Sequence, residues 1–387
     1  MGSASVAIAL AFALVHAGSS SHADSGPWAR SSRFVKGSDA RPSLAGSSSE
    51  FGAALNLRQL VGERLVVGFN SMRPPKALLS SLTHGDVAGV VLYSQNLGSR
   101  AQVIALNREL RRAGESSPLS LPPLVIVDQE GGEVRRLPGP PVRSAEEIGS
   151  THNPSLAEAI GKRAGSYLRT LGFNVDLAPV VDVARPGSEM ALEHRSFGRS
   201  PAAVSALGGA FAQGLARGGV AAVAKHFPGL GGAYADTDEN PTWIRLSRAA
   251  LMHTDIEPFR HLIDLGVPIV MVSNAVYPAF SSQPASLSVQ IANGLLRARL
   301  HFRGVSISDD LGVPALAPYG SVPQLALDGA RSGDDLLLIG HSLPMALKAG
   351  RALLHAARLG ELSHSMLASS ARRVLILRER IKRLGSG

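Results

Sequence analysis

The segment KHFPGLGGAYADTDENP (residues 225–241) places ionisable and hydrogen-bonding side chains directly after a short apolar run. The run before it, GVAAVA (219–224), is short and apolar, which is typical of a strand that is covered on both faces. Lys225 and His226 therefore stand at the carboxyl end of a buried strand. The Pro and Gly residues that follow predict an irregular loop, and this loop carries Asp-Thr-Asp at positions 236–238. In a parallel barrel, active sites are built at that end of the strands.

Carboxylates also end other apolar runs of the sequence. Asp309 directly follows VSIS, and side-chain direction alternates along a strand. We therefore expect Asp309 to point into the mouth as an ionised nucleophile and Asp310 to point away from it and cap the next helix, although SDDLG as a whole also suits a helix start. Asp128 ends PLVIVD just before two glycines, where it either stabilises a turn or accepts two hydroxyl groups of a sugar. Asp182 follows the fourth run.

Several basic residues have both a functional and an ordinary interpretation. Lys225 and His226 either serve the site or form a satisfied pair at the rim of a barrel. Arg136 and Arg195 offer a permanent charge and bidentate geometry, or they are ordinary surface arginines. The histidines lack metal-ligand spacing and the glycine-rich stretches lack nucleotide-loop spacing, so we predict neither a metal nor another cofactor.

The elements that must position these residues follow a strand-helix alternation. Eight apolar runs predict strands, at 64–69, 87–93, 123–128, 175–181, 220–224, 268–273, 304–309 and 335–340. Amphipathic segments between them, at 102–114, 155–172 and 201–219, predict helices, and 363–385 predicts a closing helix. Eight such units predict a single-domain α/β fold, a TIM (β/α)8 barrel over residues 52–386. Two packed domains are the alternative, but no linker-like composition interrupts this range.

The N-terminal region differs from the rest of the chain. Residues 4–17 are apolar but too short for a typical membrane span, and they lead into small residues that end at Ala23. We interpret residues 1–23 as an export signal and residues 24–51 as a flexible linker. This interpretation predicts that the protein is exported to the cell envelope or the medium and has no stable membrane span once the signal is removed. Because no Lys or Arg precedes the apolar run, two alternatives stay open. Either the start of the sequence is misassigned and the protein is cytoplasmic, or this region is a disordered tail.

The amino-acid composition limits the kinds of partner that the protein is expected to bind. The 387 residues include 45% hydrophobic residues, enough to bury a large core, and the formal net charge is +9. The basic residues are scattered without aromatic interleaving, so we do not expect nucleic-acid binding. The absence of cysteine excludes disulfides and a lipid-bearing Cys.

At its motifs the chain resembles family 3 glycoside hydrolases, and within them the single-domain β-N-acetylglucosaminidase (β-N-acetylhexosaminidase) branch. The matching segments are DQEGGEVRRL (128–137), FNVDLAPVVDV (173–183), RSFG (195–198), KHFPG (225–229) and SDDLG (308–312). Each is weak alone, but the five in this order are specific. The resemblance implies a retaining mechanism through a covalent glycosyl-aspartate on Asp309. It also implies that Asp128, Arg136, Arg195, Lys225 and His226 bind the sugar.

The resemblance also shows where this sequence departs from the family. The branch usually has KHFPGHG followed by an Asp-Ser-His triplet whose His is the acid/base, whereas this chain has Leu230 in the first motif and Asp236-Thr237-Asp238 as the triplet. We therefore expect Asp238 to be the acid/base, with Asp236 as its partner or as the alternative acid. Two neighbouring carboxylates disfavour double ionisation, which keeps a proton available for the leaving oxygen.

Two other functions stay open at this point. A catalytically inactive glycan-binding barrel would account for the altered triplet, although such a module has no need of Asp309. A β-glucosidase or β-xylosidase of the same family is the other alternative, but these enzymes usually add a second α/β domain. The expected substrate is an N-acetylglucosamine-containing glycan of cell-wall or chitin type, and the expected state is a monomer.

Overall fold

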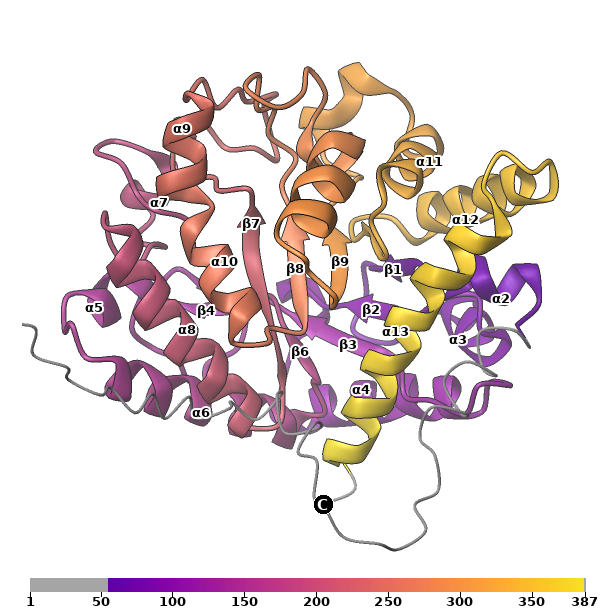
Figure 1. The fold of residues 1–387 in the computed structure, drawn as a ribbon. Helices are drawn as coiled ribbons and strands as arrows, with labels where there is room; N and C mark the ends of the chain where they lie inside the picture. The colour runs from indigo at the N-terminus through magenta and orange to yellow at the C-terminus, as the bar shows by residue number, and fades with distance from the viewer. Residues whose placement is uncertain (1–54, 386–387) are drawn as a thin grey trace, which may run out of the picture.

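Eight short strands close into one barrel in the computed structural model, which describes residues 55–385 (Figure 1). They are β1 (Leu65–Val67), β2 (Gly89–Val91), β3 (Leu124–Val127), β6 (Val175–Asp176), β7 (Ala221–Phe227), β8 (Ile269–Val272), β9 (Val305–Ser308) and β10 (Leu337–Ile339). Neighbouring strands pair in parallel in the order β10-β1-β2-β3-β6-β7-β8-β9. A parallel bridge between Ile307 and Leu336 joins the two ends of this order. The predicted (β/α)8 barrel is confirmed, and each predicted apolar run coincides with one strand, although β7 continues three residues beyond its predicted end at 224. The predicted signal (1–23) and linker (24–51) lie outside the described residues.

Helices surround the barrel. The α-helices are α2 (Leu57–Gly62), α3 (Lys76–His84), α4 (Arg100–Glu115), α5 (Ala145–Gly149), α6 (Pro154–Leu171), α7 (Glu189–Leu192), α8 (Pro201–Arg217), α9 (Arg248–Ala250), α10 (Glu257–Asp264), α11 (Val322–Ser332), α12 (Leu343–Arg358) and α13 (His364–Gly385). Short 3-10 segments are η1 (Ser94–Asn96), η3 (Ala285–Leu287) and η5 (Pro314–Tyr319), and π-helical segments are η2 (Leu251–Asp255) and η4 (Gln290–Arg299). The four helices predicted from periodicity correspond to α4, α6, α8 and α13.

The ends of α6 show why its sequence forms this helix. The side chain of Asn153 accepts a hydrogen bond from the backbone N–H of Leu156, and Pro154 occupies the first turn, where no N–H is required. Gly172 then ends the helix in the left-handed conformation, with φ of 94°. The chain is thereby turned directly into β6.

Alternate strand residues build two layers of the core. Val66, Val91 and Ile126 belong to a buried cluster shared by all eight strands, whereas Val67 and Val90 belong to the clusters that pack against the surrounding helices. Because both faces of each strand are covered, the strands are mainly apolar, as is typical of a parallel sheet, and the charged residues Lys225 and His226 lie at the carboxyl end of β7. Polar residues are therefore displaced to the ends of the strands, and these ends carry the site.

The last helix closes the amino-terminal end of the barrel. Val374, Leu377 and Ile381 of α13 pack against the barrel cluster. The guanidinium of Arg378 donates to the carbonyls of Leu121 (2.9 Å) and Pro122 (3.1 Å), which precede β3, and forms a buried ion pair with Glu63. Among the described residues, α13 therefore covers the end of the barrel that is opposite the carboxyl ends of the strands.

One hairpin was not predicted. β4 (Gln129–Gly131) and β5 (Val134–Arg135) pair antiparallel just beyond β3. These short strands contain mainly polar residues and glycine, so no apolar alternation marks them. The Gln129 amide accepts from the N–H of Leu137 (3.0 Å) and donates to its carbonyl (3.1 Å), which holds the hairpin over the barrel mouth.

Between residues 55 and 385, no helix combines the length and the apolar character that crossing a bilayer requires.

Candidate active site

A cavity of about 440 Å³ lies at the carboxyl ends of the strands. We call it the mouth cavity. Its lining includes all eight residues predicted from the sequence, namely Asp128, Arg136, Arg195, Lys225, His226, Asp236, Asp238 and Asp309. These residues follow or end strands that are far apart in the sequence, and the closed barrel brings them together as expected. Their individual roles remain predictions.

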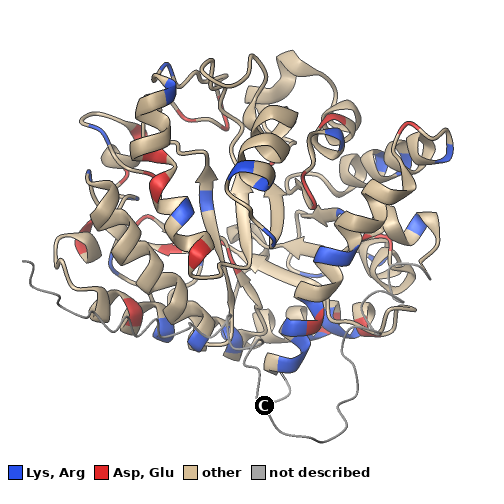
Figure 2. Ribbon diagram, viewed as in Figure 1, with Lys and Arg blue, Asp and Glu red and all other residues tan. Residues whose placement is uncertain are grey.

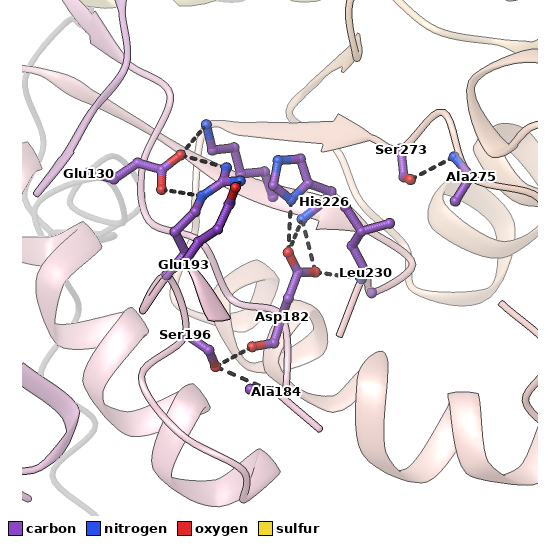
Figure 3. A network of polar contacts seen from close by, with 12 residues as sticks. Glu130, Asp182, Ala184, Glu193, Ser196, His226, Leu230, Ser273 and Ala275 are labelled. Atoms are coloured by element: carbon purple, nitrogen blue, oxygen red, sulfur yellow. Dashed lines mark hydrogen bonds and ion pairs between the residues drawn. The ribbon is translucent and has the colours of Figure 1, made fainter. Parts of the chain in front are cut away.

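The deepest part of the cavity is a cluster of paired charges (Figure 3). Lys225 Nζ lies 2.7 Å from Asp128 Oδ1 and 2.8 Å from Glu130 Oε1. Arg195 binds both oxygens of Glu130, through Nε and Nη2 at 2.9 Å each, and its Nη1 reaches Glu193 at 3.0 Å. Glu130 thus joins the two cations that were predicted as sugar-binding residues.

This cluster fixes the charge state of its members. Burial raises the pKa of Glu130, but the neighbouring charges and hydrogen bonds of Arg195 and Lys225 outweigh burial and hold this pKa at about 2. Burial lowers the pKa of Lys225, and the carboxylates of Asp128 and Glu130 reverse that effect and raise it. The cations therefore stay charged over the whole physiological range and offer rigid hydrogen-bond donors to a polar ligand.

His226 is oriented by Asp182, a fully buried carboxylate. Asp182 Oδ2 lies 2.8 Å from His226 Nδ1, and Asp182 Oδ1 accepts from the backbone N–H of Leu230 at 2.6 Å (Figure 3). This pairing places the Nδ1 proton toward Asp182 and leaves Nε2 without a partner among the described residues. Asp182, which follows the fourth predicted strand, thus positions both the His226 imidazole and the loop that comes after His226.

Asp309 follows β9 and is held at its backbone, where its N–H donates to the carbonyl of Val272 at 2.8 Å. Its Oδ1 accepts from the N–H of Asp310 at 2.9 Å. Burial raises the pKa of Asp309 above its ordinary value, whereas His226, the backbone N–H of Asp310 and Lys225 act against burial. These three groups therefore favour the ionised form that a nucleophile needs.

Asp238 lies on the loop after β7, exposed at the entrance to the cavity. Its pKa is raised to about 7, first by partial desolvation in the mouth and then by the negative charges of Asp309, Asp236 and Asp310. Asp236 Oδ1 accepts from the backbone N–H of Asp238 at 2.8 Å. Asp236 therefore shapes the turn and contributes charge, and the structure shows no hydrogen bond between the two carboxyl groups.

Glu130, Glu189 and His341 are among the lining residues of the mouth cavity that were not selected from the sequence. Glu130 was hidden within the DQEGGEVRR segment, and only the fold shows that it pairs with Arg195, 65 positions away. Glu189 has one side-chain oxygen that is buried without a partner, and its pKa is raised to about 7, first by burial and then by Glu193 and Asp236. His341 follows β10 and lacks any motif.

Asp310 differs in part from the expectation. It accepts from the backbone N–H of Gly312 at 2.8 Å, as a cap does, but the next helical segment, η5, begins only at Pro314. Its other oxygen binds His341 Nδ1 at 2.7 Å. Asp310 therefore braces the mouth and lines the cavity beside Asp309.

Among residues 55–385, no group of three or more His, Asp or Glu side chains is arranged to hold a metal ion.

A (β/α)8 barrel whose mouth combines carboxylates of different pKa with fixed cations is the arrangement expected of a glycosidase. The comparisons give the family: the model described as "Glycosyl hydrolase family 3 N terminal domain" matches residues 56–377, and the chain belongs to this family. It is a glycosidase that hydrolyses O-glycosyl bonds.

Named relatives agree with the resemblance to the β-N-acetylhexosaminidase branch. The chain is 35% identical to a beta-hexosaminidase of Stenotrophomonas maltophilia, over 74% of this chain and 87% of the relative. It is 32% identical to an uncharacterized secreted glycosyl hydrolase of Arthroderma benhamiae, over 85% of this chain and 95% of the relative.

Solved structures show the same likeness. A family 3 beta-N-acetylglucosaminidase from Paenibacillus superposes with a TM-score of 0.81 at 33% identity, and the match covers 85% of this chain but only 63% of that one. The beta-N-acetylhexosaminidase of Beutenbergia cavernae gives a TM-score of 0.78 at 29% identity, with 84% and 99% covered.

Proposed function

We propose that this protein is a retaining glycosidase that removes terminal β-linked N-acetylglucosamine, or another N-acetylhexosamine, from cell-wall or chitin-type glycans. The observation that carries the proposal is that Asp309 and Asp238 line one cavity and differ in their nearest charged neighbours. Asp309 faces His226 and Lys225, whereas Asp238 faces other carboxylates and has a pKa near 7. The names of the relatives support the choice of sugar.

Each step can be assigned to a named group. The Asp309 carboxylate attacks the anomeric carbon while the glycosidic bond breaks, and the Asp238 carboxyl gives its proton to the leaving oxygen. Asp238, now ionised, then takes a proton from water as the water oxygen attacks the same carbon. The glycosyl-aspartate bond breaks and releases the sugar and the Asp309 carboxylate. Configuration at the anomeric carbon is retained because it is inverted twice.

The charged residues at the wall of the mouth cavity hold the sugar during both steps. Asp128 and Lys225 are nearly fully buried, and Arg136 lines the same part of the mouth, so they can bind hydroxyl groups without rearrangement. Fixing the ring in this way lowers the barrier through orientation. We assign Asp128, Arg136, Arg195, Lys225 and His226 to binding of this sugar.

The experiment has two arms. A fluorinated N-acetylglucosaminyl fluoride traps the intermediate, and peptide mass analysis should locate the label on Asp309. The second arm compares Asp238→Ala on an aryl glycoside with a good leaving group and on a glycoside with a poor one. We expect the variant to lose about 100-fold more activity on the poor substrate, because only that substrate needs proton donation.

Glu189 provides the matched control, since its pKa is also raised to about 7 at the same cavity. Glu189→Gln should affect the two substrates equally. A leaving-group-dependent loss in Glu189→Gln but not in Asp238→Ala would move the acid/base role to Glu189. Sugar binding without any label on Asp309 would support the inactive glycan-binding barrel instead.

We also propose that the protein is exported. The support is the apolar N-terminal run in the sequence together with a relative that is named as secreted. Expression of the full chain followed by N-terminal sequencing of the protein outside the cytoplasm should find cleavage near Ala23. An intact N-terminus that is retained in the cytoplasm would contradict export.

A further inference from the structure

A second carboxylate-histidine pair lies at the mouth cavity, on the side of β9 and β10. His341 Nδ1 lies 2.7 Å from Asp310 Oδ2, and both residues line the cavity that contains Asp309 and Asp238. The mechanism above uses neither of them. The Asp310 carboxyl group is buried, whereas the side chain of His341 is 58% exposed.

Three strand ends hold this histidine in place. The Tyr93 ring, which follows β2, stacks on the His341 ring with 5.1 Å between the ring centres, and the Tyr93 hydroxyl lies 3.4 Å from Asp310 Oδ2. The backbone N–H of Gly340 donates to the same oxygen at 3.1 Å. A side chain at Gly340 would meet the Tyr93 hydroxyl, because a Cβ there would lie 2.2 Å from it. The histidine is therefore presented in one orientation.

The outer nitrogen of this ring is available to a ligand. Nδ1 is occupied by Asp310, and Nε2 has no partner among residues 55–385. The hydrogen bond to Asp310 raises the pKa of His341, partial burial opposes this, and the charges of Asp310 and Asp238 add to the increase. The result is an imidazole nitrogen held in one position on a half-exposed ring, where it can form a hydrogen bond with a hydroxyl group.

The position of His341 in the mouth cavity indicates which part of a substrate it contacts. The residues assigned to the terminal sugar are buried, with Asp128 at 7% and Lys225 at 3% exposure. His341 and Asp238 lie further out, where the remainder of a glycan must leave the cavity. A hydroxyl-bearing ring next to the cleaved bond would pass beside both.

We propose that His341, stacked on Tyr93, forms the binding subsite for the sugar on the leaving-group side of the cleaved bond, through a hydrogen bond between Nε2 and a hydroxyl of that sugar. This inference rests on the proposed retaining mechanism, because the same subsite must then accept an incoming sugar when the glycosyl-enzyme is resolved. The ligand class is a neutral pyranoside.

The test uses the trapped glycosyl-enzyme of the full-length protein. Its reactivation is followed in water alone and with added methyl N-acetylglucosaminide, which reaches the covalent intermediate only through the leaving-group subsite. We expect the wild-type enzyme to be reactivated faster by the sugar, with saturation. His341→Asn keeps a polar group near the position of Nδ1, where it can contact Asp310, and loses the outer nitrogen. His341→Gln instead places a polar group near the position of Nε2 and loses the contact with Asp310.

We expect His341→Asn to raise the half-saturating sugar concentration about tenfold, since the loss of one hydrogen bond to the sugar costs about 1.4 kcal/mol, which is a factor of ten. Reactivation in water should change less than about twofold, because that reaction does not use the subsite. His355→Asn on α12, an exposed histidine outside the cavity, is the matched control and should leave both rates unchanged.

Three results would overturn the inference. They are a wild-type glycosyl-enzyme that the sugar does not reactivate faster, an unchanged half-saturation in His341→Asn, and a loss confined to His341→Gln, which would show a purely structural role through Asp310. Failure to form any trapped intermediate at Asp309 would instead contradict the proposed function, so the two failures are distinguishable.

Discussion

At the scale of single residues, the environment gives chemically identical carboxylates different protonation states. Glu130 is buried between two cations and has a pKa of about 2, whereas Asp238 is surrounded by other acids and has a pKa of about 7. At neutral pH, Glu130 is ionised and Asp238 is close to half-protonated. A pair of groups separated in this way can divide binding and proton donation between them.

The pH dependence of kcat/KM should report this difference. The proposed acid must be protonated, so activity should fall as the pH rises above about 7, and the nucleophile must be ionised, so activity should fall at low pH. Asp236→Asn removes one nearby negative charge while Asn Oδ1 can still accept from the N–H of Asp238. We expect the alkaline limb to move to lower pH by roughly half a unit.

The control for this prediction is Glu239→Gln, an exposed acid of the same loop that does not line the mouth cavity. It should leave the alkaline limb in place. An alkaline limb that does not move in Asp236→Asn, or that moves to higher pH, would show that Asp238 does not set it.

At the scale of the elements, apolar runs were sufficient to predict the fold. Every strand of the barrel is buried on both faces, so each left a continuous hydrophobic run that could be read from the sequence. The β4-β5 hairpin was missed because its residues are polar, and the end of β7 was placed too early because Lys225 and His226 interrupt the apolar run while remaining in the strand.

The site was predictable only where a residue directly follows a strand or belongs to a motif. Asp309 and Asp128 follow strands, and the barrel then determines where they meet. The partners of such residues were not predictable, because Glu130 meets Arg195 and Asp310 meets His341 only through the closed fold. Local sequence contains no information on which distant side chain will complete a buried pair.

The helix α13 provides a test of how the amino-terminal end of the barrel is held closed. Basic residues recur along this helix (Figure 2), and Arg378 is the one whose side chain is buried, at 2% exposure, against Glu63. Arg378→Met leaves a buried carboxylate without its partner. We expect a loss of about 3 to 5 kcal/mol in the free energy of unfolding, measured by urea denaturation.

The double variant Arg378→Met with Glu63→Met removes both charges and should recover much of that loss, since an apolar pair of similar volume avoids the unpaired carboxylate. Arg380→Met, on the exposed side of the same helix, should change the free energy of unfolding by less than about 0.5 kcal/mol. Equal losses for Arg378→Met and Arg380→Met would show that the buried pair does not close the barrel.

At the scale of the whole molecule, the barrel makes binding and stability dependent on each other. The residues assigned to the sugar come from β7 and from the segments that follow β3 and β6, so one bound monosaccharide would connect strands from different parts of the ring. A ligand that binds only the folded barrel stabilises the complete domain by mass action. This dependence offers a measurement of sugar preference that does not require turnover.

N-acetylglucosamine at about 100 times its dissociation constant should stabilise the protein by about 2.7 kcal/mol and raise the unfolding temperature by a few degrees, as measured by calorimetry. Glucose at the same concentration should give a smaller increase, because it lacks the N-acetyl group. Asp128→Asn, whose unfolding is compared with its own sugar-free state, should show little increase with either sugar, since Asp128 is a buried acceptor at the cavity wall. Equal increases with glucose and N-acetylglucosamine would favour the β-glucosidase alternative, and an undiminished increase in Asp128→Asn would place the sugar elsewhere than in the mouth cavity.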